Sequence, residues 1–496
     1  MTTNKGLYLQ PDNVMQPDTP VGSPALVSAG EAVLLGRPPS LARWRRHHDV
    51  AAPHGTPRVL LLTSTLGAGH VRAAQAVEAA VRRRLPQATI ETLDFWSLMD
   101  RQVAYAVRQA YLRLVHASPD LYDRIYQLDQ RTWRQIVEGN QALPSCSAEV
   151  LALVPGVRER RAQSSAQGSR FLFDRVVFPL LCAAVERRAW SWPRINKVAR
   201  FSIQWAWARL SARLEARLDA FQPAVVVITQ RNLGALLSAV KSRRRWRLPA
   251  LAVLTDFGLH DFWLQPGIDR YCIAHEEIIG LDSAEIDPAR LVVTGMPLMP
   301  GFSQPPPAQQ ARAQLGLDAR APVVLVLGGG LGLGVETAAE RLLARSGDVQ
   351  VVVAAGHNGT ARSALAKLEA GYSPRLRVLG WTERMEAAMC AADIVVGKPG
   401  GLTVAETLAC GRPLVATRSL GGQEGFNVRF LEQHGAGRLV PEGELVSWID
   451  SVLRDRSALP HMRDSVTRLG RRDGADRVAE LALEMALARR FARPVV

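Results

Sequence analysis

The sequence of 496 residues lacks the features that mark secreted, membrane-spanning or metal-binding chains. Its five cysteines stand singly, with no Cys-x-x-Cys, which argues against a disulfide framework or a zinc site and fits a reducing compartment. The N-terminus has no apolar core, so we expect no signal peptide. The longest apolar runs, such as residues 176–185, fall well short of the ~20 residues that a spanning helix needs. We therefore expect a cytoplasmic protein that is soluble or peripherally bound to a membrane.

Acidic residues are outnumbered, with 46 Asp and Glu against 61 Lys and Arg, so the formal net charge is +15. A chain this basic implies an anionic partner, which could be nucleic acid, an acidic membrane or a phosphorylated ligand. No zinc-finger or RNP-like motif is present, so we expect no nucleic-acid partner. Aromatic residues make up only 6%, yet there are 11 tryptophans.

The pattern of apolar runs predicts two α/β domains. Short runs of the type that forms buried parallel strands alternate with helical patterns in two successive sets. We expect two doubly wound, Rossmann-like domains that face each other across a cleft, with ligands at the carboxyl ends of the strands. The predicted segments are a poorly ordered basic arm at 1–56, a first domain at 57–302 with a helical basic stretch, a linker at 303–320, a second domain at 321–475 and a C-terminal helix at 476–496.

A short glycine loop follows the first predicted strand and opens the first helix. Gly67 and Gly69 let a backbone approach a ligand closely, and the exposed helix start attracts anions. His70, the next residue, is a candidate general base. The alternative is a tight turn with a solvent-facing histidine. The loop is not the dinucleotide fingerprint, because Arg72 stands where the third glycine would be.

Glycine-rich stretches also follow strands of the second domain. Residues 328–334 contain five glycines but no Gly-Lys-Ser/Thr, which excludes a Walker loop. These glycines either cradle a phosphate or allow close approach of the domains. At 398–406, Gly400 and Gly401 open a helix whose N–H groups can hold a diphosphate, and Glu406 is placed to accept hydrogen bonds from a ribose. Thr403 and Glu406 could instead be a capping pair.

Two further loops carry polar groups suited to a sugar. Gln423, Glu424 and Asn427 lie on a glycine-held loop, where amides and a carboxylate can meet hydroxyls, unless this is an ordinary polar loop. In the first domain, residues 255–263 end a strand with acidic, imidazole and aromatic groups. Asp256 could be a base, could orient one, or could cap the loop.

Taken together, these stretches resemble one family in composition and order. It comprises the monogalactosyldiacylglycerol synthases and processive diacylglycerol glucosyltransferases of glycosyltransferase family 28. More distantly, the chain resembles the N-acetylglucosaminyl transferase that makes lipid II. The matching stretches are the loop 67–70, the segment 255–263, Gly295-Met296-Pro297, and residues 328–334, 398–406 and 422–427.

The resemblance implies the GT-B fold and an inverting, metal-independent transfer from a UDP-sugar to a lipid, without a cofactor. His70 is implied as the acceptor-side catalytic or lipid-headgroup residue, with Asp256 as the other candidate base. The implied donor ligands are Gly328, Gly329, Gly330, Trp381 beside uracil, Gly400, Gly401, Thr403, Glu406, Gln423, Glu424 and Asn427. Gly67, Gly69, His260 and Trp263 would form the acceptor loops.

A membrane surface is the expected anionic partner. The stretch 157–217 is rich in Arg, and basic helices with interfacial tryptophan suit an anionic bilayer. The alternative is that these tryptophans fill a helical core beneath a solvated basic face. The residues expected at the inner face of the plasma membrane are Trp190, Trp192, Trp205, Trp207, Arg244 and Arg245.

The expected activity is transfer of a hexose from a UDP-hexose to diacylglycerol or a related membrane lipid. Three alternatives stay open: the same fold acting on a polyprenyl-linked, carotenoid or other hydrophobic acceptor, a UDP-sugar epimerase, and a non-enzymatic basic lipid- or nucleic-acid-binding protein. The sequence does not distinguish glucose from galactose.

Overall fold

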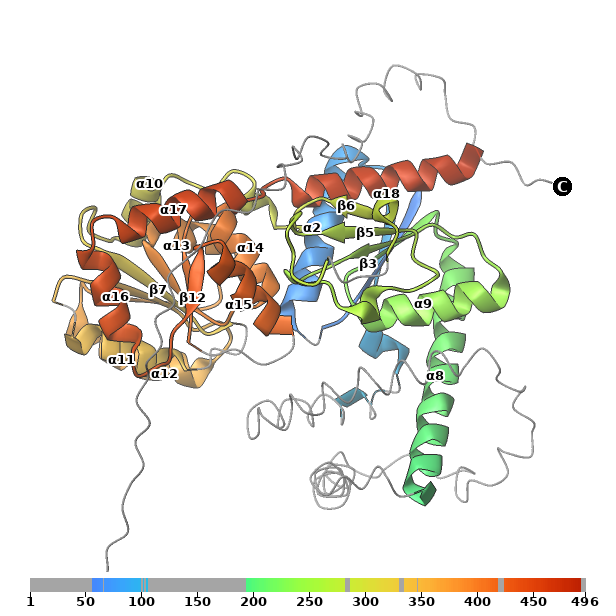
Figure 1. Cartoon of the computed structure of the whole chain (residues 1–496), viewed down its shortest axis with the longest axis horizontal. Coiled ribbons are helices and arrows are strands. Elements are labelled where there is room, and N and C mark those ends of the chain that lie inside the picture. Colours follow the sequence, from blue (N-terminus) through green and yellow to red (C-terminus); the bar gives the residue numbers. More distant parts are fainter. Residues whose placement is uncertain are drawn as a thin grey trace, which may run out of the picture. The chain divides into compact units, whose positions relative to one another are not determined.

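The structure, a computed structural model, describes residues 56–65, 67–99, 101, 104–105, 193–281, 286–329, 334–345, 347–417 and 423–491. The predicted basic arm therefore lies almost entirely outside the described residues, as does much of the predicted helical stretch after residue 100. Within the described ranges, two parallel six-stranded sheets are each flanked by helices (Figure 1). The predicted class of two doubly wound α/β domains is confirmed.

The first sheet has the strand order β2-β1-β3-β4-β5-β6, and every neighbouring pair is parallel. Its middle strands are apolar throughout because both faces are covered. Leu60 and Leu62 of β1 face the core shared with α8 and α9, whereas Val59 and Leu61 face α2 and α18. The elements are β1 (Arg58–Thr63), α2 (Ala68–Arg84), β2 (Thr89–Asp94), α8 (Pro193–Phe221), β3 (Val225–Ile228), α9 (Arg231–Arg244), β4 (Ala250–Val253), β5 (Arg270–Ile273), β6 (Leu291–Val293) and the 3-10 turns η1 (Phe95–Leu98), η5 (Asp261–Trp263), η6 (Pro288–Arg290) and η7 (Pro300–Phe302).

Helix α18 (Gly474–Phe491) returns from the second domain and packs on the first (Figure 1). Its apolar stripe, which includes Val478, Ala482 and Ala486, is buried against Val77 of α2 and the first sheet. Asp476 also pairs with Arg83, at 3.1 Å, and with Arg84. The first domain is therefore completed by residues far along the chain.

The second sheet has the order β12-β11-β10-β7-β8-β9, again with parallel neighbours. Apolar residues of α11, α12 and α16 cover one face, and those of α13, α14 and α17 cover the other. The elements are α10 (Ala308–Leu315), β7 (Val323–Leu327), α11 (Val335–Arg345), β8 (Gln350–Ala354), α12 (Gly359–Tyr372), β9 (Leu376–Leu379), α13 (Met385–Ala391), β10 (Ile394–Gly397), α14 (Gly401–Ala409), β11 (Leu414–Ala416), α15 (Gln423–Gln433), β12 (Gly437–Leu439), α16 (Leu445–Arg454) and α17 (Ala458–Leu469).

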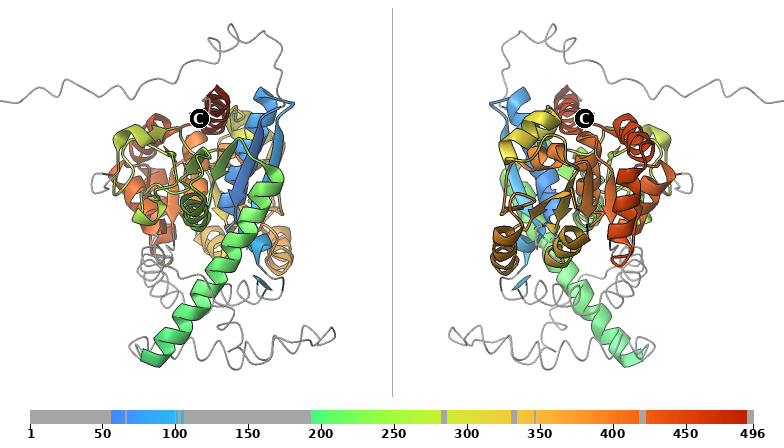
Figure 2. Two further views of the ribbon diagram at one scale, coloured as in Figure 1. Left: turned by 90° about the vertical axis from the view of Figure 1, so that its right-hand side faces the viewer. Right: turned by 90° about the vertical axis from the view of Figure 1, so that its left-hand side faces the viewer.

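Helix α8 extends away from the first sheet toward its N-terminal end (Figure 2). Toward its C-terminal end, a stripe at helical spacing packs against α9: Trp207, Leu210, Leu214, Leu218 and Phe221. Trp207 is only 3% exposed, so the expectation that it contacts a membrane is wrong. It fills a core instead.

The other residues expected at a membrane have mixed placements. Trp190, Trp192 and the side chain of Trp205 lie outside what the structure describes. Arg244 is engaged on the protein surface: its Nη1 lies 2.7 Å from Oδ2 of Asp219, and its guanidinium carbon lies 4.1 Å from the centre of the Trp246 ring. Arg245 ends α9 in a left-handed conformation and is exposed. Among the described helices, none combines the length and apolar character required to cross a membrane.

Candidate active site

The predicted glycine loop and the start of α2 lie at the carboxyl edge of the first sheet. Gly67 precedes α2 with a φ of +99°, a conformation that favours glycine. His70 is partly buried, and its Nδ1 lies 3.1 Å from Oγ1 of Thr255, which follows β4. The structure thus brings together the loop after β1 and the loop after β4, as parallel strands require.

Neighbouring polar side chains hold this loop in place. Asp94, at the end of β2, accepts hydrogen bonds from N and Oγ1 of Thr65 at 3.0 and 2.8 Å. Oγ1 of Thr229, after β3, donates to the carbonyl oxygen of His70 at 3.1 Å. Nε1 of Trp96 donates to Oγ of Ser64 at 3.1 Å. The backbone that carries His70 is therefore fixed from two neighbouring strand ends.

Asp256 is the buried carboxyl group of the site, with 8% of the residue exposed. Burial raises its pKa, and a hydrogen bond from Asn427 and the charges of His70, Arg231 and Lys398 oppose that rise. Burial likewise lowers the pKa of His70, while the negative charge of Asp256 raises it. The charge of each group therefore favours the ionised form of the other and opposes the effect of burial on both.

Helix α14 of the second domain begins directly against this site. A Cβ added to Gly401 would lie 1.9 Å from the carbonyl oxygen of Thr255, and one added to Gly69 would lie 3.7 Å from Cβ of Leu402. Only glycine at 401 allows so close an approach. The same close approach brings the N-terminal turn of α14, with Gly400 and the partly buried Thr403, next to His70 and Asp256.

Glu406 lies farther along α14 and is partly buried. Burial raises its pKa to about 8, and the charge of Arg72 in α2 opposes this shift. The guanidinium carbon of Arg72 also lies 5.9 Å from the centre of the Trp381 ring. Trp381 is 47% exposed and stacks on His357 at 4.0 Å. Arg72 of the first domain thus faces two of the predicted donor-binding residues.

Helix α15 supplies Gln423, Glu424 and Asn427, which have different surroundings. Gln423 is partly buried, and Glu424 is buried with its Oε1 2.5 Å from Nζ of Lys398. Asn427 has 0% exposure, and its amide is bonded to protein groups on both sides. The amide of Asn427 is enclosed between the two domains, and its role as a donor ligand stays a prediction.

The glycine stretch after β7 is described only in part. The N–H of Gly328 donates to the carbonyl oxygen of Ala354 at 3.3 Å. Gly329 has a φ of +61° with open space around the position of a Cβ. Gly330 lies outside the described residues. The left-handed backbone conformation accounts for a glycine at position 329. That Gly329 contacts the sugar donor stays a prediction.

The segment after β4 does not line one cleft along its whole length. Thr255 and Asp256 belong to the site, but Trp263 is 2% exposed in the core of the first domain, so its predicted place in an acceptor loop is wrong. His260 is partly buried, and its Nδ1 accepts a hydrogen bond from N of Phe262 at 3.0 Å. The chain turns inward here because Phe257, Leu259, Phe262 and Trp263 are all buried apolar side chains.

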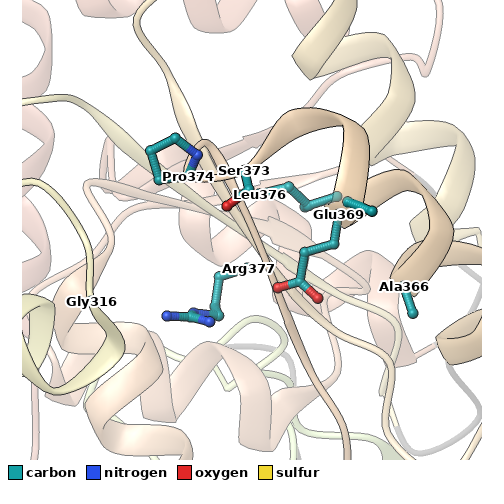
Figure 3. Close-up of a pocket in the computed structure, with 8 residues that line it drawn as sticks. Gly316, Ala366, Glu369, Ser373, Pro374, Leu376 and Arg377 are labelled. Carbon is teal, nitrogen blue, oxygen red and sulfur yellow. The ribbon is translucent and has the colours of Figure 1, made fainter.

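A cavity of about 330 Å³ lies elsewhere, beside β9 (Figure 3). Glu369 of α12 and Arg377 of β9 both line the cavity. Glu369 accepts a hydrogen bond from N of Val378, and Arg377 donates one to the carbonyl oxygen of Leu315. The cavity shares no residue with the predicted site. Among the described residues, no group of three or more His, Cys, Asp or Glu side chains is arranged to hold a metal ion.

Several residues around the site could not be recognised as such from the sequence. Arg231 carries no motif signal of its own, Thr255 and Lys398 stood out only as parts of longer stretches, and Arg72 only as a departure from the dinucleotide fingerprint. Oδ1 of Asn232, at the start of α9, is buried without a hydrogen-bond partner. The one available signal was position, since residues immediately after parallel strands gather at one edge.

Comparison with known families decides the class of the protein. Residues 187–298 match the monogalactosyldiacylglycerol (MGDG) synthase model, and residues 323–478 match the C-terminal domain of glycosyltransferase family 28. The processive diacylglycerol beta-glucosyltransferase of Bacillus licheniformis is 30% identical over 266 residues, which is 52% of this chain and 67% of that protein. The enzyme of the same name from Bacillus subtilis is 29% identical over 293 residues, covering 57% and 75%.

The chain belongs to the MGDG synthase and processive diacylglycerol glucosyltransferase family. It is accordingly a glycosyltransferase, as expected from the sequence. The family ranges contain Asp256, Gly401 and Glu406, whereas His70 precedes both. The place of His70 beside Thr255 therefore comes from the structure.

Two solved structures share the fold of this family member. MurG of Acinetobacter baumannii has a TM-score of 0.51 at 14% identity, covering 86% of this chain and 99% of that one. The glycotransferase of kitacinnamycin has a TM-score of 0.50 at 14% identity, covering 87% and 100%. Both support the predicted GT-B arrangement and, at this identity, nothing beyond the fold.

Proposed function

We propose that the protein transfers a hexose from a UDP-hexose to the hydroxyl of diacylglycerol or a related membrane lipid, with inversion and without a metal ion. The observation that carries this proposal is the direct apposition of His70 and Asp256 to the N-terminal turn of α14. In this proposal the proton acceptor and the anion-stabilising helix start act on one reacting centre. The names of the relatives, diacylglycerol glucosyltransferases, support the choice of acceptor.

His70 is the general base of the proposed reaction. When its Nδ1–H donates to Oγ1 of Thr255, Nε2 carries the lone pair that accepts the proton of the acceptor hydroxyl. The oxygen then attacks the anomeric carbon as the bond to UDP breaks, so the configuration inverts. Asp256 stabilises the imidazolium that forms, since its charge favours the protonated ring.

The second domain holds the donor in this proposal. The N–H of Gly400 already donates to the carbonyl oxygen of Lys398 at 2.9 Å, so Gly400 shapes the turn and the N–H groups of Gly401 and Thr403 stabilise the departing diphosphate. The start of the helix supplies the positive potential that a metal ion supplies in other transferases. Glu406 accepts hydrogen bonds from the ribose, and Trp381 borders uracil. Gln423 and Glu424 bind the hexose.

The lipid acceptor requires access from a membrane surface. Arg245 and its exposed neighbours at the end of α9 lie on the first domain, which also carries His70. We propose that this basic surface binds anionic lipid on the inner face of the plasma membrane.

Purified protein, with liposomes of anionic lipid and diacylglycerol, tests the proposal. Radiolabelled UDP-glucose and UDP-galactose are supplied separately in the presence of EDTA, and label is measured in the organic phase. Label from one donor identifies the sugar and supports a metal-independent transfer. UDP binding with no lipid label from either donor overturns diacylglycerol as the acceptor, and label that requires added Mg²⁺ overturns the metal-free mechanism.

A further inference from the structure

Asn427 forms three hydrogen bonds, of which two, to Phe257 and Asp256, join the second domain to the first and one, to Pro399, lies within the second domain. Its Oδ1 accepts from N of Phe257 at 2.7 Å, and its Nδ2 donates to Oδ1 of Asp256 at 3.1 Å and to the carbonyl oxygen of Pro399 at 2.9 Å. The amide thus uses both its donor hydrogens and its acceptor, with 0% of the residue exposed.

We propose that Asn427 is a positioning residue, which orients the Asp256 carboxylate through the docked second domain and so couples the donor-binding helix α15 to the proton-transfer pair. This inference rests on the proposed function, in which Asp256 assists His70. It gives the asparagine a role in arranging the site rather than in binding the sugar.

Several groups around Asp256 favour its ionised form against the effect of burial. His70 on α2, Arg231 at the start of α9 and Lys398 after β10 are the charged groups that act on it, all cationic when protonated. Burial raises the pKa of Asp256, and of the groups that oppose this rise the hydrogen bond from Asn427 is the strongest. Hydrogen bonds to a charged group contribute roughly a ten- to hundred-fold factor in the equilibrium.

The position of Asn427 is fixed by its neighbour in the sequence. A Cβ added to Gly258 would lie 2.3 Å from Cγ of Phe426, so the ring occupies the space beside that glycine. The guanidinium carbon of Arg429 lies 4.9 Å from the centre of the same ring. Phe426 packs against the segment 256–258, and Asn427 forms hydrogen bonds with the same segment. These two contacts fix where α15 lies on the first domain.

Kinetics of four variants test the proposal in the full chain: N427A, N427D, D256N and the double variant N427A/D256N. We expect N427A to lower kcat about ten- to hundred-fold while KM for the UDP-hexose changes less than about threefold. N427D should shift the acid limb of the kcat profile to higher pH, because it removes both donors and places a second carboxyl against Asp256. Gln433→Ala, an exposed residue of the same helix, is the matched control and should change neither value.

Thermal unfolding gives a readout that does not depend on the substrate. The folded-state pKa of Asp256 is raised, so its ionisation costs stability as pH rises from its unfolded value toward the folded one. In N427A the folded-state pKa rises further, and the decline in Tm should extend to higher pH than in the wild type. In the D256N background the pH-dependent part of the N427A effect should vanish.

The two proposals fail in different ways. If neither UDP-hexose gives a glycolipid product, the proposed function is overturned. The pH dependence of Tm still tests whether Asn427 orients Asp256. An unchanged Tm profile in N427A, or an N427A effect of equal size with and without Asp256, overturns the positioning role. A raised KM with unchanged kcat would make Asn427 a donor ligand and overturn it as well.

Discussion

Nδ1 of His70 lies 3.1 Å from Oγ1 of Thr255, the residue that immediately precedes Asp256. The same residue therefore orients the imidazole through its side chain and carries the adjacent carboxyl through its backbone. Thr255→Val keeps the shape and removes the hydroxyl, so we expect kcat to fall about tenfold with UDP affinity unchanged. Steady-state kinetics and calorimetric UDP titration measure the two effects. A loss of UDP affinity equal to the loss in kcat would contradict this role.

The pH dependence of turnover should report His70. Burial holds its pKa below the usual value of 6.5, so the neutral base persists at neutral pH and is lost only as pH falls below that value. The acid limb of kcat should therefore lie below about pH 6.5. His70→Ala should remove this limb and lower kcat by about 10²- to 10⁴-fold with little change in UDP affinity. Wild-type turnover in His70→Ala would exclude the residue from the mechanism.

Gly401 should be intolerant of any side chain, in contrast to its neighbour Gly400. Alanine at 401 places a Cβ 1.9 Å from the Thr255 carbonyl oxygen, whereas at 400 the closest of the neighbouring atoms is Oγ1 of Thr403, at 4.0 Å. We expect Gly401→Ala to cost about 1–3 kcal/mol of unfolding free energy and to lower kcat, because α14 must move from Asp256. Gly400→Ala is the matched control for stability. Equal urea midpoints for the two variants would refute the close contact.

The pKa of Glu406, raised by burial to about 8, predicts pH-dependent UDP binding. If the carboxylate accepts hydrogen bonds from the ribose, binding favours the ionised form, so Kd should fall as pH rises from 7 to about 8 and then level off. Binding should also release a proton, which calorimetry in buffers of different ionisation heat detects. Glu406→Gln should flatten the profile. Affinity that weakens with rising pH would mean that the protonated acid is the binding form.

Substitution of Trp207 distinguishes a role of α8 in the protein core from a role at the membrane. Its side chain is buried with Leu210 and Leu214, so Trp207→Ala should cost about 3–5 kcal/mol of unfolding free energy. Arg245 is exposed, so we expect Arg245→Glu to leave the free energy of unfolding nearly unchanged. The same substitution should lower the fraction of protein that sediments with anionic vesicles. Urea unfolding and vesicle pelleting measure both. A stable Trp207→Ala variant that no longer binds vesicles would restore the membrane interpretation.

Most of the two sheets could be predicted from sequence because parallel strands covered on both faces are continuous apolar runs, as in β1 and β8. The strand β12 was missed. It has only three residues, Gly437–Leu439, of which Arg438 and Leu439 are exposed at the sheet edge, so no apolar run marks it. Glycine loops at strand ends were likewise found by composition and order.

What the sequence could not reveal is which polar group turns toward a ligand and which toward the other domain. Asn427 and Gln423 share one loop signature, yet the first is enclosed and the second is partly exposed at the start of α15. The partner of Asn427, Asp256, lies 171 positions away in the sequence. Such contacts depend on how the domains pack, which no local pattern encodes.

The return of α18 to the first sheet makes the second domain an insertion within the first. The backbone crosses between them twice, before β7 and again at Gly474, whose missing Cβ would lie 2.3 Å from the carbonyl oxygen of Met296. During synthesis the second domain can therefore finish folding while the first still waits for α18. A cut at one crossing would leave the two domains tethered by the other.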